Sequence, residues 1–229
     1  MTAVKANPPV TAPVEDYLKV IFELESAAGV AGTNEIASEL GFAPASVSGM
    51  IRRLAEQGLI THERYRGVRL TKAGRRAALR TIRRHRVIEA YLTKALGYPW
   101  DRVHDEAERL EHAASDELID RMAEAIGEPT TDPHGAPIPT RDGTLAEDPP
   151  LVGLDEVAVG ERVSIERVGD RDAEQLRYLA EVGITPGRTV QVLSRAPFDG
   201  PIELRIGRAT KSIGPALAKQ ILVSVIRAD

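Results

Sequence analysis

The sequence predicts a mainly α-helical protein that carries a small β-barrel in its last third. Two short helices around a glycine turn, followed by two short strands, indicate a winged helix-turn-helix. Two longer helical patterns come next, and beyond residue 150 the apolar residues alternate as they do in strands. The 229 residues are enough for two or three small domains, so we expect a modular chain.

The first helix is predicted over residues 14–28. Leu18, Ile21 and Phe22 recur at helical spacing, and Gly29 follows as a stop. The residues before this helix contain three prolines and one lysine but no long apolar run, so we expect a flexible tail and not a signal peptide. No segment approaches the roughly 20 apolar residues that span a bilayer. We therefore expect a cytoplasmic protein with no membrane role.

A pair of short helices is predicted next, one starting at Thr33 or Asn34 and one at Pro44, with a turn at Gly41 between them. The apolar residues of each helix fall on one side, as packing against a core requires. These inward residues are Ile36, Ala37 and Leu40 in the first helix and Val47, Met50, Ile51 and Leu54 in the second.

A β-hairpin is predicted directly after the helix pair. The segment that follows Gly58 reads as two short strands around Arg66 and Gly67, and the second strand alternates between apolar and polar residues. A hairpin in this position is the wing of a winged helix-turn-helix.

Two long helices are predicted over residues 75–97 and 104–127, where Gly97 and Gly127 mark the ends. Their apolar residues exceed what one small wing domain needs, so we expect the helices to pair between two copies of the chain. These residues include Ile82, Ile88, Leu92, Leu110, Leu118 and Met122.

The last third is predicted to fold separately. Residues 128–150 are rich in Pro, Gly and Asp, the composition of a linker. Segments 161–168, 188–195, 202–207 and 221–227 alternate like strands, and one helix is expected near residues 173–182. The predicted domains are the winged helix-turn-helix with its tail over 1–74, a helical domain over 75–140, a linker over 141–150 and the barrel over 151–229.

The charge of the chain is unevenly distributed. The formal net charge is −4, but residues 52–86 hold twelve Arg or Lys against two acids, whereas residues 101–128 hold ten acids against three arginines. The first region could meet the phosphates of nucleic acid, and the second could meet cations. The chain has no cysteine, which excludes disulfides, thiol catalysis and thiolate metal sites.

Side chains of the kinds that bind metals share one face of each long helix, because they recur at spacings of three and four residues. The second helix offers His104, Glu108, Glu111 and His112, and the first offers His85 and Glu89. Antiparallel packing of the two helices would join these sets.

The plain alternative is that these residues are solvated charges, which contribute a few tenths of a kcal/mol per pair. Three histidines and three glutamates gathered in one place would instead need a counter-cation. Carboxylates and imidazoles without sulfur suit Mn²⁺ or Fe²⁺, although Zn²⁺ has the higher intrinsic affinity. His62 and His134 have no such partners in the sequence, and we interpret them as surface or structural residues.

The second helix of the short pair is predicted to enter the major groove of double-stranded DNA. Its outward residues are small and are followed by two arginines, which lets the backbone approach the bases while the arginines bind guanine or phosphate. These candidates are Pro44, Ala45, Ser46, Ser48, Gly49, Arg52 and Arg53, with Thr33 on the preceding helix. Arg64, Arg66 and Arg69 of the hairpin would bind phosphates. Surface arginines are often merely solvated, but the wing and the basic region together favour DNA as the partner.

These features together resemble the diphtheria toxin repressor (DtxR/MntR) family of metal-dependent regulators, and most closely its manganese-responsive members from actinobacteria. The resemblance covers nearly the whole chain and rests on VEDYLKVIFELE, LAEQGLI, HRVIEAYL, VHDEAERLEH, DPHGAPIP and LRYLAEVGI. It implies a homodimer, an SH3-like (FeoA-like) C-terminal barrel, and metal as corepressor. It also implies a transcriptional repressor that controls manganese homeostasis genes through a palindromic operator.

The resemblance further implies two metal sites, each with most of its ligands in the domain over residues 75–140. The primary site would consist of Asp16, Glu108, Glu111 and His112, and the second of His85, Glu89 and His104, completed by Asp172 and Gln175 of the barrel. Iron-responsive relatives typically carry Met and Cys where this chain has Asp16 and Glu108, which favours Mn²⁺, with Zn²⁺, Co²⁺ or Cd²⁺ as surrogates. Asp172 and Gln175 could instead cap a helix or face solvent.

Three alternatives stay open at this point. An iron-dependent repressor would share the fold and replace Mn²⁺ by Fe²⁺. A metal-dependent hydrolase could use Glu and His around a divalent ion to activate water, but the array is not HExxH, so we expect no enzyme. A metal-storage protein would have no use for a recognition helix and a basic wing.

Overall fold

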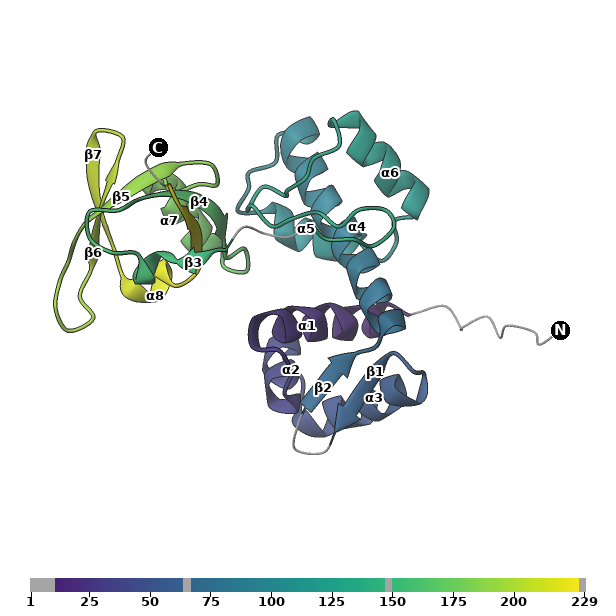
Figure 1. Ribbon diagram of the computed structural model, residues 1–229. Helices are drawn as coiled ribbons and strands as arrows, with labels where there is room; N and C mark the ends of the chain where they lie inside the picture. The colour runs from purple at the N-terminus through teal and green to yellow at the C-terminus, as the bar shows by residue number, and fades with distance from the viewer. Residues whose placement is uncertain (1–10, 64–66, 147–149, 227–229) are drawn as a thin grey trace. The chain divides into compact units, whose positions relative to one another are not determined.

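The computed structural model describes residues 11–63, 67–146 and 150–226, which form two compact units (Figure 1). The first unit comprises the described residues up to Arg83 together with Pro139–Thr144. The second comprises Arg84–Ile138 and the described residues from Leu145 onward.

The first unit has the predicted winged helix-turn-helix arrangement (Figure 1). Its elements are α1 (Ala12–Ala28), α2 (Thr33–Leu40), α3 (Pro44–Glu56), β1 (Ile60–Glu63) and β2 (Gly67–Leu70). The two strands pair antiparallel, which confirms the predicted hairpin. The inward faces of the helices form a core that includes the fully buried Leu18, Ile21, Ile36, Ile51 and Leu54.

The turn between α2 and α3 depends on Gly41. Its φ of 67° lies in the left-handed region, which glycine adopts without a steric penalty. In this conformation its N–H donates to the carbonyls of Ala37 and Ser38 and ends α2. Pro44 then occupies the first turn of α3, where its missing N–H costs nothing.

The hairpin is attached to the rest of the first unit by its second strand. Val68 and Ala31 exchange two backbone hydrogen bonds of 2.8 and 3.0 Å. The carboxylate of Glu25 on α1 accepts a 3.2 Å hydrogen bond from the backbone N–H of Leu70 and lies 3.4 Å from the Arg75 guanidinium. These contacts fix the base of the wing.

Helix α4 (Lys72–Leu96) runs from the first unit into the second and begins before the predicted residue 75. In its first half Lys72, Arg75 and Arg76 are exposed, whereas its second half buries His85 and Glu89. The helix therefore exposes basic side chains near its start and encloses two titratable side chains in its second half.

The prediction of a single helix over residues 104–127 is wrong. The chain forms α5 (Val103–Leu110) and α6 (Asp116–Ala125), with a turn between them. Ser115 caps α6, because its side chain accepts a 3.2 Å hydrogen bond from the N–H of Leu118. The helices pack on α4 around an apolar cluster that includes Val87, Ile88, Val103, Ala107 and Ile119.

The C-terminal part of the second unit is one antiparallel sheet in the order β3-β8-β4-β5-β6-β7. Its strands are β3 (Val152–Gly153), β4 (Arg162–Val168), β5 (Thr189–Arg195), β6 (Ile202–Ile206), β7 (Ala209–Ile213) and β8 (Ile221–Val225). The short helices are η1 (Leu154–Glu156), α7 (Ala173–Val182) and α8 (Pro215–Ala218). Within the described residues no pairing joins β3 to β7, so the expected closed barrel is not found.

The sheet and α7 enclose a core of aliphatic side chains, among them Ile165, Leu176, Leu179, Val192 and Leu204. The predicted helix near residues 173–182 is confirmed as α7. None of the helices in the described ranges is both long and apolar enough to cross a membrane.

Candidate metal centre and DNA-binding surface

Helix α4 places two titratable side chains one turn apart in the interior of the second unit. His85 is 6% exposed and Glu89 is 0% exposed. A buried carboxylate is costly unless charged or hydrogen-bonded partners surround it. The neighbours of these two residues therefore decide what this region can do.

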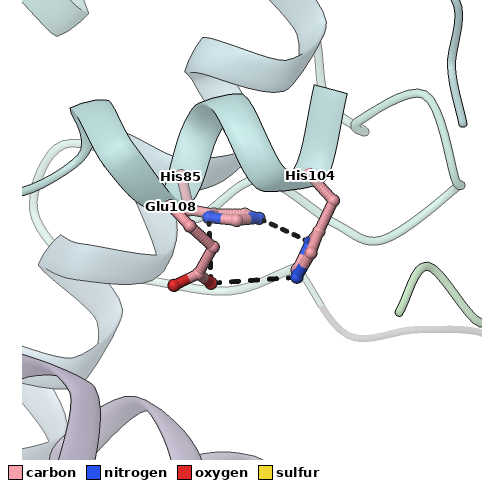
Figure 2. Close-up of side chains that lie close together, drawn as sticks. All are labelled: His85, His104 and Glu108. Carbon is pink, nitrogen blue, oxygen red and sulfur yellow. Dashed lines mark hydrogen bonds and ion pairs between the residues drawn. The ribbon is translucent and has the colours of Figure 1, made fainter. Parts of the chain in front are cut away.

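His85 lies between two carboxylates. Its Nδ1 is 2.5 Å from Oε2 of Glu111, and its Nε2 is 3.1 Å from Oε1 of Glu89. Nε2 is also 3.2 Å from Nδ1 of His104, and Nδ1 is 3.7 Å from Oε1 of Glu108 (Figure 2). The structure thus brings together around His85 five of the six residues that helical spacing had suggested, the sixth being His112.

Glu111 and His112 lie at the end of α5 and in the turn that follows, not within a continuous helix. Glu111 is the C-terminal cap of α5 and is fully buried. His112 is half-buried, with Nε2 3.6 Å from Oε1 of Glu111. The break between α5 and α6 therefore falls inside the predicted HxxxExxEH array. Asp16 lies on α1, in the first unit.

His134 is a member of this region that the sequence interpretation missed. It is 0% exposed, and its Nε2 donates a 2.8 Å hydrogen bond to the carbonyl of Trp100. Its Nδ1 faces Oε2 of Glu89 at 3.8 Å, too far for a hydrogen bond but close enough for an ion pair. The available signal was the Asp-Pro-His-Gly segment of residues 132–135, where Asp132 accepts hydrogen bonds from the N–H groups of His134 and Ala136.

Asp170 is a second missed residue, and it comes from the C-terminal sheet region. Its Oδ2 lies 3.9 Å from Nδ1 of His104. Asp172 instead caps α7, accepting hydrogen bonds from the N–H groups of Glu174 and Gln175 at 2.9 and 3.1 Å. The Gln175 amide donates to Asp172 at 3.0 Å, so these two predicted ligands bind each other in the structure.

The electrostatics of this region favour charged groups. Burial alone would raise the pKa of Glu89, but its interactions with His104, His134 and His85 outweigh burial and hold that pKa well below its usual value. Burial would lower the pKa of His134, but the Glu89 carboxylate raises it to about 9. The pKa of His104 is also raised, because Glu89 and Asp170 outweigh its burial. In the absence of a cation, protonated histidines therefore balance the negative charge of these carboxylates.

These residues fit a divalent cation. Within the second unit, three groups have ligand atoms within 4.8 Å of one another: His85, His104 and Glu108; Glu89, His104 and Asp170; and Glu89, Asp132 and His134. Oε2 of Glu89 and Nδ1 of His134 are buried without a hydrogen-bond partner. Their 3.8 Å separation is short enough for one ion to contact both, since metal bonds to carboxylate oxygen and imidazole nitrogen are roughly 2.0–2.2 Å.

The surface predicted to bind DNA lies on α3. Arg52, Arg53 and Gly49 are exposed, and a Cβ added at Gly49 would have no atom within 4 Å. Ser48 is also exposed, but its hydroxyl donates a 2.9 Å hydrogen bond to the carbonyl of Pro44. The other α3 candidates Pro44, Ala45 and Ser46 are exposed, Thr33 is half-buried, and Arg69 is exposed on β2. Arg64 and Arg66 lie outside the described residues.

An apolar groove of about 510 Å³ lies beside these residues, between α1 and α3. Tyr17 and the half-exposed Phe42 stack in it with ring centroids 6.3 Å apart. Met50, which the sequence placed inward, lines this groove and is only half-buried. The groove is lined by Pro13, Tyr17, Phe42, Ser46, Gly49, Met50 and Arg53.

Comparison with known protein families accounts for the same three regions. Residues 10–68 match the iron dependent repressor, N-terminal DNA binding domain. Residues 71–140 match the iron dependent repressor, metal binding and dimerisation domain, and residues 152–225 match the FeoA domain. The matched regions span both the α3 surface and the buried histidines.

Two characterised relatives extend this match over most of the chain. The iron-dependent repressor IdeR of Mycobacterium tuberculosis is 32% identical over 190 residues, covering 78% of this chain and 82% of the relative. The diphtheria toxin repressor of Corynebacterium diphtheriae is 31% identical, covering 83% and 87%. The chain belongs to the diphtheria toxin repressor family. Its members are metal-dependent transcriptional repressors and not enzymes, which leaves the hydrolase alternative without support.

Solved structures of family members share the fold. A manganese-dependent transcriptional repressor in complex with manganese is 41% identical, with a TM-score of 0.85 over 93% of this chain and 100% of that one. ScaR with bound Zn²⁺ is 31% identical, with a TM-score of 0.79 over 93% of this chain and 99% of that one. This diphtheria toxin repressor family member therefore resembles structures that hold different divalent metals.

Proposed function

We propose that this chain is a manganese-dependent repressor that binds a palindromic operator as a homodimer, with metal as corepressor. The observation that carries the proposal is the buried group of imidazoles and carboxylates around Glu89. Its donors are nitrogen and oxygen only, because the chain has no cysteine. A site made of such hard donors suits Mn²⁺ better than a site that contains a thiolate does.

The family relatives support metal dependence but do not identify the metal, so its identity is argued from the chemistry of the ligands. The relative named for iron is 32% identical over 78% of this chain, and the structure named for manganese is 41% identical over 93% of it. Within the resemblance, iron-responsive members carry Met and Cys at the positions of Asp16 and Glu108. Replacement of both sulfur donors by carboxylates hardens the primary site, which favours Mn²⁺ over Fe²⁺.

We assign two ligand sets to this function. The primary set is the one that the resemblance implies: Asp16, Glu108, Glu111 and His112. For the second set we retain His85, Glu89 and His104, and we add Asp132, His134 and Asp170 because their ligand atoms face Glu89 or His104. Asp172 and Gln175 are less suited, since they already satisfy each other at the start of α7.

The proposed switch follows from where the primary ligands lie in the sequence. Asp16 belongs to α1 of the DNA-binding unit, whereas Glu108, Glu111 and His112 belong to the other unit. A bound cation would supply the positive charge that lets these carboxylates share one site. Asp16 would then hold the DNA-binding unit in the arrangement that sets two recognition helices about 34 Å apart, one turn of duplex. A nearly complete shift of population requires roughly 5.5 kcal/mol of differential binding.

Fluorescence anisotropy tests this function. DNA from upstream of the gene for this protein and of neighbouring metal-transporter genes is titrated with Mn²⁺, Fe²⁺, Zn²⁺ or chelator present. We expect tight binding that Mn²⁺ restores at a lower free concentration than Fe²⁺. Restoration by Fe²⁺ at the lower concentration would indicate the iron-dependent alternative, and equal binding in chelator would refute metal as corepressor.

A matched pair of variants tests the switch. Asp16→Ala removes the only proposed ligand in the DNA-binding unit, so we expect loss of metal-dependent DNA binding with dimerisation retained. Glu15→Ala removes the adjacent carboxylate of the same helix, which is half-buried like Asp16, and should leave DNA binding intact. Unchanged metal-dependent binding by Asp16→Ala would rule out this route.

A further inference from the structure

We infer that the FeoA domain is clasped to the helical domain without metal, and that this clasp positions Asp170 beside the histidines. The clasp consists of Trp100, His134 and Gly135 on the helical side and of Glu166–Val168 of β4 on the other side. The positioning of a metal ligand rests on the proposed function, whereas the metal-independent contact does not.

Trp100 is the first part of the clasp. It lies in the turn between α4 and α5, yet its side chain packs against the core of the FeoA domain. The indole also stacks on His134, with ring centroids 5.6 Å apart and an angle of 26° between the planes. These contacts partly bury a large aromatic side chain, and they need no bound cation.

Gly135 is the second part, and it brings two backbones into direct contact. Its φ is +90°, and a Cβ added there would lie 1.9 Å from the carbonyl oxygen of Glu166. No residue except glycine allows this approach. Glu166 is the extra residue of a β-bulge in β4, since Ile165 and Arg167 pair with consecutive residues of β8. A bulge turns the strand locally toward its neighbour.

Main-chain and ionic contacts continue the clasp on either side. The N–H of Val168 donates a 3.0 Å hydrogen bond to the carbonyl of His134. Arg177 of α7 forms a 3.0 Å ion pair with Asp101, the residue after Trp100. None of these contacts uses a ligand atom of the proposed metal centre, so they require no cation.

The position of Asp170 follows from the same contacts. It is two residues beyond Val168, so the hydrogen bond from Val168 to His134 fixes the chain close to where Asp170 leaves the strand. Its carboxylate then lies 3.9 Å from His104 and shares a ligand group with Glu89. Trp100 and Gly135 are thus positioning residues that bring a ligand of the FeoA domain to the histidines in advance of the metal.

The single tryptophan of the chain reports the clasp directly. Acrylamide quenching of Trp100 is measured on the full-length protein in chelator and with Zn²⁺, which avoids quenching by paramagnetic Mn²⁺. We expect the same blue-shifted emission and the same Stern–Volmer constant in both states. Emission typical of exposed tryptophan in chelator, shifting to the blue only with Zn²⁺, would overturn the metal-independent clasp.

Gly135→Ala tests the close approach, and Gly127→Ala is its matched control. Gly127 has a similar φ of +82°, but an added Cβ there meets nothing within 4 Å, so both variants carry the same backbone strain and only one collides. We expect Gly135→Ala in chelator to red-shift the emission of Trp100 and to raise the Stern–Volmer constant, with the control unchanged. Equal emission in the two variants would overturn the role of Gly135.

A double variant separates positioning of Asp170 from damage to His134. Gly135→Ala should weaken the second metal site by about 10- to 100-fold, the usual cost of losing a partner of a metal ligand. If the clasp acts through Asp170, adding Asp170→Asn to Gly135→Ala causes little further loss, because coupled sites are not additive. Fully additive losses would show that Gly135 acts elsewhere. Failure of Mn²⁺ to restore DNA binding would refute the proposed function and leave the quenching results untouched.

Discussion

Helix α3 and the second half of α4 are both amphipathic, but they place their charged residues on opposite sides. Helix α3 buries Val47, Ile51 and Leu54 and exposes Arg52 and Arg53. An exposed arginine keeps its water and remains free to exchange that water for a phosphate or a base. Its position matters only relative to a partner outside the chain.

The second half of α4 instead buries two titratable residues, His85 and Glu89. His85 and Glu89 are enclosed by α5, by the Asp132–Ala136 turn and by the end of β4. Buried charges must find their partners within the protein, so their geometry is set before any ligand arrives. The comparison shows why DNA binding and metal binding use different parts of the chain. DNA binding depends on exposed side chains, whereas metal binding depends on buried ones.

The largest effect should come from the interior. Glu89→Gln keeps the volume of the side chain but removes the charge that faces three histidines. We expect the Mn²⁺ affinity of the second site to fall by at least about 100-fold, since even partners of metal ligands typically account for 10–100-fold. Isothermal titration calorimetry with Mn²⁺ measures this loss.

Glu117→Gln is the control for that substitution. Glu117 lies on α6 with its carboxylate 78% exposed and pairs with Arg121 one turn away at 3.3 Å. The same chemical change there should leave Mn²⁺ affinity as it was. If both variants bind Mn²⁺ like the unmodified chain, the interior carboxylate is not a ligand and the contrast between the two helices fails.

The next effect concerns the surface. Arg52→Ala and Arg53→Ala should each weaken operator binding by about 1–3 kcal/mol if the arginine contacts a base, and should lower the salt slope by about 1 if it contacts a phosphate. Anisotropy titrations over a range of salt concentrations distinguish these two roles. Metal affinity should not change, because Arg52 and Arg53 belong to the first unit, whereas the buried histidines of the metal centre belong to the second.

Arg121→Ala provides the comparison for the arginine variants. Arg121 is an exposed arginine of α6 in the other unit. Its removal tests whether general loss of positive charge weakens binding as much as loss from α3. Equal effects at Arg121 and at Arg53 would argue against α3 as the recognition helix.

Helix α3 was predictable from the sequence, whereas the buried metal centre was predictable only in part. The α2–α3 pair could be predicted because glycine and proline mark its turn and its start, and because each helix has one apolar side. His85 and Glu89 could be matched to His104 because regular helical spacing carries through to three dimensions. The local sequence pattern was sufficient to predict contacts wherever a helix ran without a break.

The rest of the interior depends on breaks in regular structure. Helix α5 ends at Leu110, where a continuous pattern had suggested one long helix, so the cap at Ser115 overrode the apolar periodicity. His134 reaches Glu89 from a turn, and Asp170 reaches His104 from the end of a strand. Contacts between segments so far apart in the chain have no signature in spacing.

A smaller effect follows from the protons of the histidines. The pKa of His134 is raised to about 9, so its ring carries a proton at neutral pH that metal binding must displace. Affinity for Mn²⁺ should therefore rise by up to about tenfold per pH unit as pH increases toward 9. Calorimetry at pH 7 in buffers of different ionisation enthalpy should show about one proton released from His134, with His104 adding to it.

His134→Gln and His62→Gln locate that proton. His62 is exposed on β1, so its loss should leave the number of released protons unchanged. His134→Gln should reduce the number by about one. Identical proton release in both variants would show that the histidine facing Glu89 is neutral before metal binds.

The smallest effect tests the attachment of the wing. Glu25→Ala removes the acceptor for the N–H of Leu70, so the free energy of opening the hairpin should fall by about 1 kcal/mol, the low end of the cost of an unpaired donor, because this hydrogen bond is only partly buried. Hydrogen exchange of the Leu70 amide measures this opening. Glu56→Ala, an exposed change on α3, should alter it by less than about 0.5 kcal/mol. If the wing contributes to operator binding beside α3, operator affinity should fall together with Leu70 protection. Loss of Leu70 protection without any loss of operator affinity would mean that α3 alone binds DNA.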